Sequence, residues 1–320
     1  MSSIWTMGEI LVEIMRPRPG IPLHEPAEFL GPFPSGAPAI FIDTVARLGH
    51  PAGIVGGVGD DDFGRCVLNR LEADGVNCDH VLRAPHQSTA VAFVTYFDDG
   101  SRQFIFHIDG TPAVQARYTP ADSIQAPAYF HIMGCSLMTN DHFRRHIIQT
   151  MVSFYNHGAT VSFDPNIRPE LLGGKGLNEV IGPVLDRCSV LFPGTAELEL
   201  LTGQSDVEAG VQQLFDTKPV EIIVVKRGKK GSIIYTRSSA VDIPPYRTDE
   251  VDPTGAGDCF DGAFLCGLLE ERSLEECGQM ASAAGALNAA AFGPMEGAIS
   301  KASVEEVMRL GCVPTDEDMP

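Results

Sequence analysis

Residues 251–264 read VDPTGAGDCFDGAF. Within this stretch, three small residues, Gly255, Ala256 and Gly257, are followed directly by Asp258. The apolar residues after Asp258 recur at helical spacing, which predicts a tight turn followed by a helix with an acid in its first turn. Backbone N–H groups at a helix start bind anions, and small residues let a phosphate approach closely. Because Asp258 could take a proton from a hydroxyl beside that phosphate, the stretch indicates phosphoryl transfer to an alcohol.

The run D-P-T-G-A-G-D resembles the C-terminal signature of the ribokinase family of sugar and nucleoside kinases, also called the PfkB family. That signature is close to D-T-x-G-A-G-D, and Asp252 and Thr254 match it as well. Taken alone, the stretch could also be a glycine-rich turn that only caps a core helix. The resemblance implies that Asp258 is the catalytic base, that Thr254 and Gly257 contact ATP, and that a monovalent cation such as K⁺ binds near Asp252. Since a helix start favours negative charge, we expect the pKa of Asp258 to be lowered.

The same resemblance implies a ribokinase-like fold, which is a three-layer α/β/α sandwich with a mostly parallel central sheet and a small β lid. We expect one kinase domain over residues 1–320. The pattern after Pro127 agrees, because apolar strands at 129–133, 159–163 and 221–225 alternate with helical segments. Polar clusters follow these strands, at the edge where ligands gather.

Composition limits the class of protein. The chain has 320 residues and a net charge of −19, so nucleic acid and anionic membranes are unfavourable partners. Its eight cysteines include no C-x-x-C pair, which favours reduced core residues over disulfides or a zinc site. Glu9 and Glu13 interrupt the first apolar stretch, so we expect no signal peptide, and no apolar run reaches membrane-spanning length. These features predict a soluble cytoplasmic protein.

A hairpin is predicted by β-rich runs at 89–97 and 102–107, joined by Asp-Asp-Gly-Ser. An early inserted hairpin suits a lid over the site, although an ordinary sheet hairpin is the alternative. We expect the lid to be built from about 11–34 and 88–111. In the family such a lid also mediates dimers, so the resemblance implies a homodimer.

Five residues match the sugar side of the family's site. Glu13 takes the place of the sugar-binding acid, since a carboxylate accepts bonds from neighbouring hydroxyls. Gly36 matches one glycine of the family's G-G-x-x-x-N motif. The segment D-P-N-I-R resembles one in fructokinase-like and keto-sugar-acid kinases, with Asn166 and Arg168 facing the sugar or the transferred phosphate. His107 lies where keto-acid kinases have a lid tyrosine. Structural readings remain open: an edge-strand acid for Glu13 and an Asp–Arg pair in a turn for Arg168.

Three positions depart from the family motifs. On the sugar side, Ser35 replaces a glycine and Ile40 replaces an asparagine that would bind sugar hydroxyls, and in the family's N-x-x-E motif Gly194 replaces the asparagine. The resemblance implies that Glu197 organises Mg²⁺ through water, since magnesium keeps most of its waters.

A glycine-rich turn and a later asparagine complete the predicted ATP site. The residues concerned are Lys226, Gly228 and Gly231 after a late strand, and Asn288 in an alanine-rich helix. A basic hairpin turn and a core hydrogen-bonding amide are the respective alternatives.

The substrate prediction depends on the lid. Keto-acid kinases carry Tyr-Arg-x-Gly there, whereas alignment on Gly110 puts Ile108 at the Arg position and Asp109 beside it. A sugar carboxylate would lose its ion pair, so we expect ATP-dependent phosphorylation of a neutral ketohexose, tagatose or fructose. The alternatives are a 2-keto-3-deoxygluconate kinase and a non-catalytic sugar-binding regulator. A dinucleotide-binding oxidoreductase is disfavoured because Phe260 occupies the third glycine position of G-x-G-x-x-G.

Overall fold

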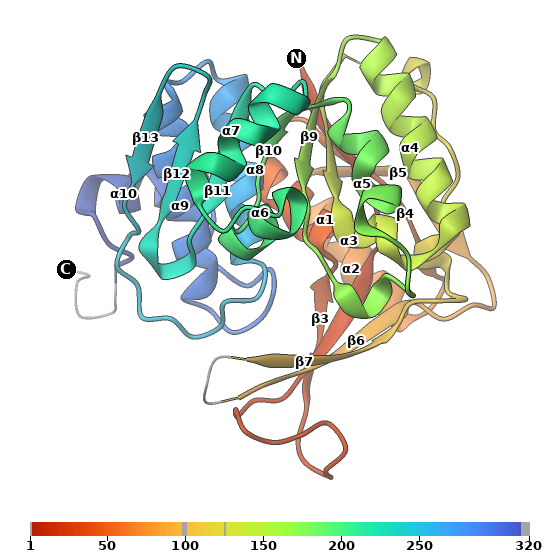
Figure 1. The fold of residues 1–320 in the computed structure, drawn as a ribbon. Helices are drawn as coiled ribbons and strands as arrows, with labels where there is room; N and C mark the ends of the chain where they lie inside the picture. Colours follow the sequence, from red (N-terminus) through yellow and green to blue (C-terminus); the bar gives the residue numbers. More distant parts are fainter. Residues whose placement is uncertain (1, 98–100, 125, 315–320) are drawn as a thin grey trace.

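A large, mostly parallel sheet forms the centre of the molecule (Figure 1). The computed structural model describes residues 2–97, 101–124 and 126–314. Within these residues the strand order is β13-β12-β11-β10-β9-β8-β1-β4-β5. Every pair from β11 to β5 is parallel, and β12 and β13 add an antiparallel edge. The strands are β1 (Ser3–Met7), β4 (Ala52–Gly59), β5 (Val76–Ala84), β8 (Pro127–Met133), β9 (Thr160–Asp164), β10 (Cys188–Leu191), β11 (Ile222–Lys226), β12 (Ser232–Tyr235) and β13 (Ala240–Ile243).

Helices cover both faces of this sheet, because its strands are apolar on both sides. On β4, for example, Ile54 belongs to one hydrophobic cluster and its neighbour Val55 to another. The first cluster packs under α1 (Ala37–Arg47), α2 (Asp62–Ala73), α8 (Ala256–Leu269), α9 (Leu274–Ala289) and α10 (Lys301–Leu310). The second packs under α3 (Gly134–Thr139), α4 (Asp141–Asn156), α5 (Leu177–Leu185), α6 (Thr195–Thr202) and α7 (Val207–Thr217). The expected three-layer ribokinase-like architecture is confirmed.

A second, smaller sheet projects from one end of the molecule (Figure 1). Its order is β3-β2-β6-β7, with β6 and β7 forming an antiparallel hairpin. We call this sheet the lid; its strands are β2 (Leu11–Met15), β3 (Leu30–Ser35), β6 (Ala90–Tyr96) and β7 (Arg102–His107). The hairpin appears where the sequence predicts it, and its turn at 98–100 lies outside the described residues.

The opening segment departs from a simple strand. It forms two strands in two different sheets, β1 in the central sheet and β2 in the lid. Gly8, between them, has no room for a side chain, because a Cβ there would lie 2.3 Å from Cγ of Pro38. The chain can therefore cross closely over the start of α1 and carry Glu9 and Glu13 to the boundary of the two sheets. Among the described residues, four short 3₁₀ turns complete the fold: η1 (Pro112–Val114), η2 (Ala121–Ser123), η3 (Pro169–Leu171) and η4 (Gly228–Lys230).

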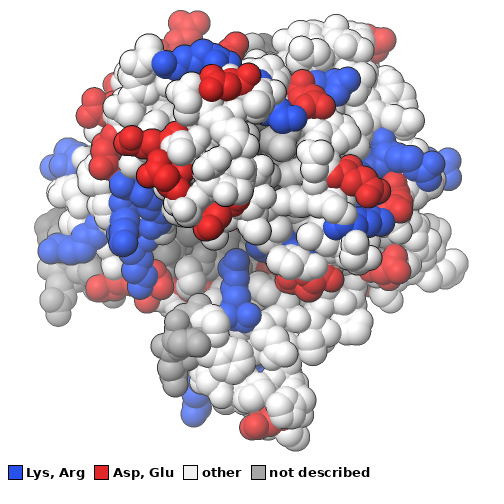
Figure 2. Space-filling view, viewed as in Figure 1, with Lys and Arg blue, Asp and Glu red and all other residues white. Residues whose placement is uncertain are grey.

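The surface agrees with the composition. On the face shown in Figure 2, basic and acidic side chains are interspersed. All eight cysteines are free thiols. Among the described residues, the helices lack the combination of length and apolar character needed to cross a membrane.

Candidate active site

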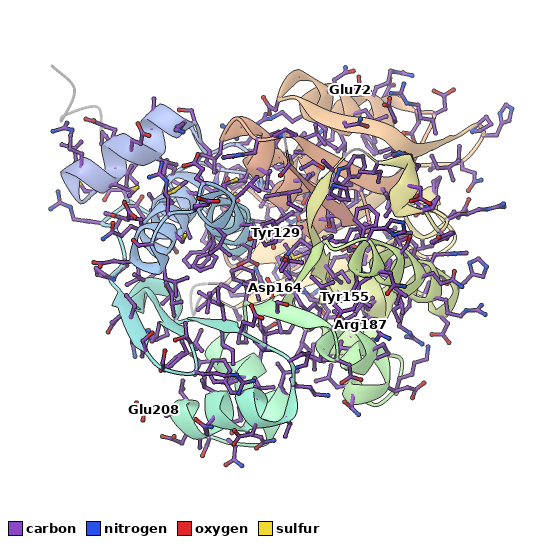
Figure 3. All side chains as sticks on the ribbon, turned by 90° about the horizontal axis from the view of Figure 1, so that it is seen from above. Glu72, Tyr129, Tyr155, Asp164, Arg187 and Glu208 are labelled. Carbon is purple, nitrogen blue, oxygen red and sulfur yellow. The ribbon has the colours of Figure 1, made fainter. Side chains whose placement is uncertain are left out.

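A cavity of about 290 Å³ lies between the central sheet and the lid. Asp164 and Lys226, at the ends of β9 and β11, contribute from the central sheet, and Glu13 and Phe104 contribute from the lid. Figure 3 shows Asp164 near the middle of the molecule, and only 3% of this residue is exposed. The cavity thus occupies the carboxyl edge of the parallel strands, where α/β proteins bind ligands.

The turn before α8 forms part of the cavity wall. Gly255 has φ 76°, and a Cβ on it would lie 2.3 Å from the carbonyl oxygen of Pro294. Gly257 faces more open space, since its nearest neighbour would be Nζ of Lys226 at 3.7 Å. Gly255 and Gly257 both line the cavity. Ala256 differs from the expectation, because its N–H donates to the carbonyl oxygen of Pro253 at 3.3 Å.

Buried polar side chains hold this turn in place. One oxygen of Asp252 accepts from the backbone N–H and the hydroxyl of Thr254, at 3.0 and 2.6 Å, and the other accepts from the N–H of Gly293. The amide of Asn288 donates to the carbonyl oxygens of Thr254 and Pro294, at 2.7 and 3.0 Å. Asn288 is fully buried and lies outside the cavity lining. The amide therefore supports the turn from behind, and its contact with ATP stays a prediction.

Asp258, in the first turn of α8, points into the cavity with 9% of its surface exposed. The side-chain amide of Asn166 donates to its Oδ1 at 3.4 Å. Burial raises the pKa of Asp258 to about 7, and nearby Asp164 acts in the same direction. The expected lowering of this pKa is wrong, since desolvation outweighs the helix dipole.

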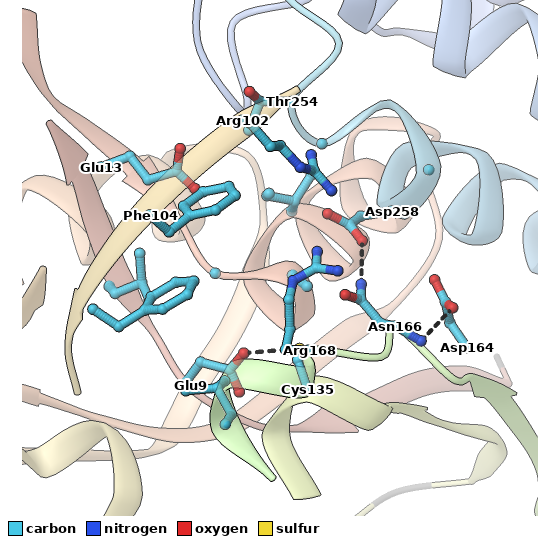
Figure 4. A pocket seen from close by; sticks show the side chains of 18 of the residues that line it. Glu9, Glu13, Arg102, Phe104, Cys135, Asp164, Asn166, Arg168, Thr254 and Asp258 are labelled. Atoms are coloured by element: carbon cyan, nitrogen blue, oxygen red, sulfur yellow. Dashed lines mark hydrogen bonds between the residues drawn. The ribbon is translucent and has the colours of Figure 1, made fainter. Parts of the chain in front are cut away.

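The loop after β9 carries Asn166 and Arg168 into the site (Figure 4). Asp164 Oδ1 accepts the backbone N–H of Asn166 at 2.9 Å, and Asn166 has φ 35°, which asparagine tolerates better than most residues. Oδ1 of Asn166 is buried and has no hydrogen-bond partner among the described residues. The guanidinium of Arg168 forms no ion pair within the described parts of the chain. Both side chains remain available to a ligand.

Lys226 is the centre of a buried ion cluster. Its Nζ lies 2.8 Å from Asp164 Oδ2 and 3.2 Å from Asp261 Oδ2. These carboxylates raise the pKa of Lys226 in spite of burial. Lys226 reaches the cavity, as predicted, but it is already paired there. Gly228 and Gly231 form the turn between β11 and β12 and lie outside the cavity lining.

Glu197, at the start of α6, joins two loops of the site. It accepts the backbone N–H groups of Ile167 and Gly194, at 2.8 and 2.7 Å. Burial, followed by the charge of Asp164, raises its pKa. Within the described residues, no group of three or more His, Cys, Asp or Glu side chains could hold a metal ion. A carboxylate whose oxygens already accept N–H bonds fits Mg²⁺ that is held mainly by phosphate oxygens and water.

Glu13 and Gly36 line the cavity where the lid meets the start of α1. Ser35 donates to Oε1 of Glu13 at 2.7 Å, whereas Oε2 is buried without a partner among the described residues. Burial raises the pKa of Glu13 to about 7. Gly36 has φ 107°, and a Cβ there would lie 2.5 Å from the carbonyl oxygen of Glu9.

The inner face of the lid is set by strand alternation. Arg102, Phe104 and Phe106 on β7, and Ile108 just beyond it, all line the cavity. His107 is exposed on the other face, with its ring 6.0 Å from that of Phe93. Its predicted contact with the substrate is therefore corrected.

Sequence reasoning missed several cavity residues. Glu9 is buried, with Cys135 and Ser136 donating to its two oxygens, and its pKa is raised by burial. Arg102 and Phe104 were also missed. The period of two along β7 is the signal that could have found them, because Ile108 had already been placed toward the substrate.

Comparisons with known proteins agree with this geometry. A family profile described as pfkB family carbohydrate kinase matches residues 20–301. Fructokinase-1 of Oryza sativa subsp. japonica is 33% identical over 318 residues, which cover 95% of this chain and 96% of the relative.

Solved structures match over a similar span. An E. coli protein provisionally named Ribokinase II, solved in complex with ATP and Mg²⁺, is 37% identical with a TM-score of 0.90, covering 97% of this chain and 100% of that one. A fructokinase from Xylella fastidiosa with bound ATP is 27% identical with a TM-score of 0.85, covering 96% and 98%. The protein is thus a sugar kinase that uses ATP. The chain belongs to the pfkB family of carbohydrate kinases.

Proposed function

We propose that this kinase phosphorylates a primary hydroxyl of a neutral ketohexose, tagatose or fructose, with Asp258 as the general base. The observation that carries the proposal is the position of Asp258. Its carboxylate lies in the cavity at the start of α8, beside the Gly255–Gly257 turn and bonded to Asn166. This places a proton acceptor directly beside N–H groups that can receive a phosphate.

Different groups in the cavity would bind the sugar and the transferred phosphoryl group. Oε2 of Glu13 and Oδ1 of Asn166 are buried acceptors without partners in the described structure, and sugar hydroxyls would supply the missing donors. The N–H groups of Gly255 and Gly257 would face the transferred phosphoryl group. Asp258 would accept the hydroxyl proton late in the transfer, when the oxygen has become acidic, so most of the catalysis is positioning and charge stabilisation.

ATP and metal ions complete this assignment. When bound, Mg²⁺ would neutralise charge on the ATP phosphates, and Glu197 is the residue we assign to hold it through water. Lys226 would hold the buried carboxylates in their charged form. The part of its ammonium group that faces the cavity would contact phosphate. A monovalent cation near Asp252 stays a prediction, since both oxygens of that carboxylate already hold the turn.

The substrate assignment rests on the chemistry of the lid. Ile108 faces the cavity, as the argument against a sugar acid requires. Arg102 places a cation on the same face, which the sequence argument had overlooked. However, Arg102 and Ile108 are six residues apart along an extended chain, roughly 20 Å. Figure 4 shows Arg102 near Thr254 and Asp258, at the phosphoryl end of the site. Ile108 is apolar and cannot itself form an ion pair with a carboxylate.

The lid also supports a proposed homodimer. Its outer face exposes Ile105 (42%) and Leu30 (39%), which are large apolar side chains on edge strands. Pairing with another copy would cover this apolar area and the free strand edges. The chain would act as a single kinase domain with the lid as its only inserted part.

A substrate panel tests the proposed function. We expect kcat/KM at saturating ATP to be highest for tagatose or fructose, lower for ribose, and lowest for 2-keto-3-deoxygluconate. A preference of more than about tenfold for the keto acid would refute the Ile108 argument, because one such ion pair is worth a factor of that size. In that case Arg102 or Arg168 would be holding the carboxylate. Absence of ATP consumption with every sugar would favour the non-catalytic regulator.

A further inference from the structure

Arg102 is a cavity residue to which the proposed function gives no part. It begins β7 and lines the cavity together with Thr254, Gly255 and Asp258. Figure 4 shows its guanidinium reaching from the lid toward Asp258. Within the described parts of the chain it forms no ion pair, although its charge acts on Glu13 and Asp258. Arg102 is exposed at the mouth of the cavity, so water can solvate its charge, and its position beside Asp258 is what places a cation where a phosphoryl group would pass.

A hydrogen bond fixes this end of the lid to the turn before α8. The hydroxyl of Tyr96 bonds to the hydroxyl of Thr254, which itself bonds to Asp252. Tyr96 is directly opposite Arg102 in the β6–β7 register. The contact therefore places the first residue of β7 above the turn that leads into α8. The ring of Phe104 lies beneath Arg102, with the guanidinium carbon 5.4 Å from its centroid.

We infer that Arg102 is a catalytic residue of the lid, which contacts the phosphoryl group during transfer and is positioned by Tyr96. The inference rests on the proposed function, since it requires a phosphoryl group to pass beside Asp258. The sugar oxygen forms a bond to the γ-phosphorus, and the bond from that phosphorus to the β–γ bridging oxygen breaks. The electron pair stays on ADP, and the hydroxyl proton goes to Asp258. Arg102 is unchanged and neutralises charge on the transferred oxygens, as guanidinium groups do in other phosphoryl transferases.

A kinetic comparison of Arg102→Met and Arg102→Lys tests the inference, using the best sugar from the panel. We expect Arg102→Met to lower kcat by about 10²–10³, with KM for ATP and sugar changed less than about threefold, because the contact forms mainly in the transition state. Arg102→Lys should restore part of the loss, since it keeps the charge but not the fork-shaped pair of donors. Gln103→Met, on the opposite face of the same strand, is the matched control and should match the wild type.

A second readout separates transition-state contact from a structural role. In the wild type, aluminium fluoride should tighten MgADP binding in the presence of sugar, because the complex mimics the transferred group. In Arg102→Met, the factor by which aluminium fluoride tightens MgADP binding should be at least about tenfold smaller. The affinity for MgADP without fluoride should be unchanged. Tyr96→Phe should lower kcat less than Arg102→Met does, and the double variant should be no slower than Arg102→Met alone, since both act through one contact.

Two results would overturn the inference. One is Arg102→Met with wild-type kcat and a raised KM for sugar, which would make Arg102 a sugar-binding residue. The other is fluoride-dependent tightening that survives the substitution. A wild-type enzyme that phosphorylates none of the sugars would instead refute the proposed function, so the two failures can be told apart. Thermal unfolding of each variant shows whether a lost rate reflects a lost fold.

Discussion

The pH dependence of kcat/KM tests the assignment of Asp258 as the base. Burial raises the pKa of this carboxyl from its ordinary 3.8 to about 7. A general base works only when it is ionised, and kcat/KM reports the groups of the free enzyme. Activity should therefore be full above the raised pKa and fall as the pH drops through it.

The size of the effect follows from the pKa. With a value of about 7, Asp258 is ionised to about nine tenths at pH 8 and to about one tenth at pH 6. We expect kcat/KM to fall at least about tenfold between those pH values, measured with saturating ATP and varied sugar, and further where Glu13 must also be ionised. With an unshifted pKa, the same interval would show almost no change. In Asp258→Asn, kcat should fall by about 10²–10⁴ and the acid limb of the pH profile, which is the fall of kcat/KM at low pH, should disappear. The binding of sugar and ATP should be nearly unchanged.

Glu13 requires a control, because burial raises its pKa to about 7 as well. In the Glu13→Gln enzyme the limb that belongs to Asp258 should remain, with a slope of about one per pH unit. Any ionisation of ATP is common to all variants and cancels in the comparison. A flat wild-type profile between pH 6 and 8, or turnover by Asp258→Asn close to that of the wild type, would refute the reasoning.

Three further predictions follow from the same contacts. Glu13→Gln should raise KM for the sugar about 10–100-fold with KM for ATP unchanged, because it removes a charged acceptor; equal changes in both constants would contradict this. Lys226→Met should lower the free energy of unfolding in urea by about 3–5 kcal/mol, since it leaves buried carboxylates unpaired, whereas Lys230→Met on the exposed turn should have little effect. Ile105→Asp should convert a sedimenting dimer into an active monomer; a wild-type monomer at micromolar concentration would refute the lid dimer.

The fold could be predicted from the sequence because its signals are local. Continuous apolar strands alternating with helices indicate a parallel sheet buried on both faces, and α4 has the bounds 141–156 that its periodicity gives. The start of the lid near residue 11 was predicted, whereas the close crossing of the chain over the start of α1 was not. It depends on the close approach of Gly8 to Pro38, and such a contact between distant turns leaves no periodic pattern in the sequence.

The site was predictable only in part, for a similar reason. The motif residues Asp258, Asn166 and Arg168 do come together around one cavity. Asn288 lies behind the turn instead of beside it, because an amide in a helix gives no sign of which layer it faces. His107 was placed toward the substrate and Arg102 was missed for one and the same reason. Their order on β7 was known, but the face toward the cavity was assigned from a motif and not from the alternation of the strand.

Asp258 shows why the electrostatics of a site cannot be inferred from position alone. The first turn of a helix stabilises a carboxylate by about 0.3–1 kcal/mol, which is less than one pKa unit. Removal from water can shift a carboxyl by up to about 3–5 units in the opposite direction. The sequence did hold a sign of this burial, since α8 carries a second acid, Asp261, inside an otherwise apolar helix, and that residue is fully buried. A helix that is apolar on every side must lie in the core, so its acids are desolvated. The raised pKa gives Asp258 more affinity for the sugar proton than an exposed aspartate has, while Lys226 and the two arginines keep the charged form accessible near neutral pH.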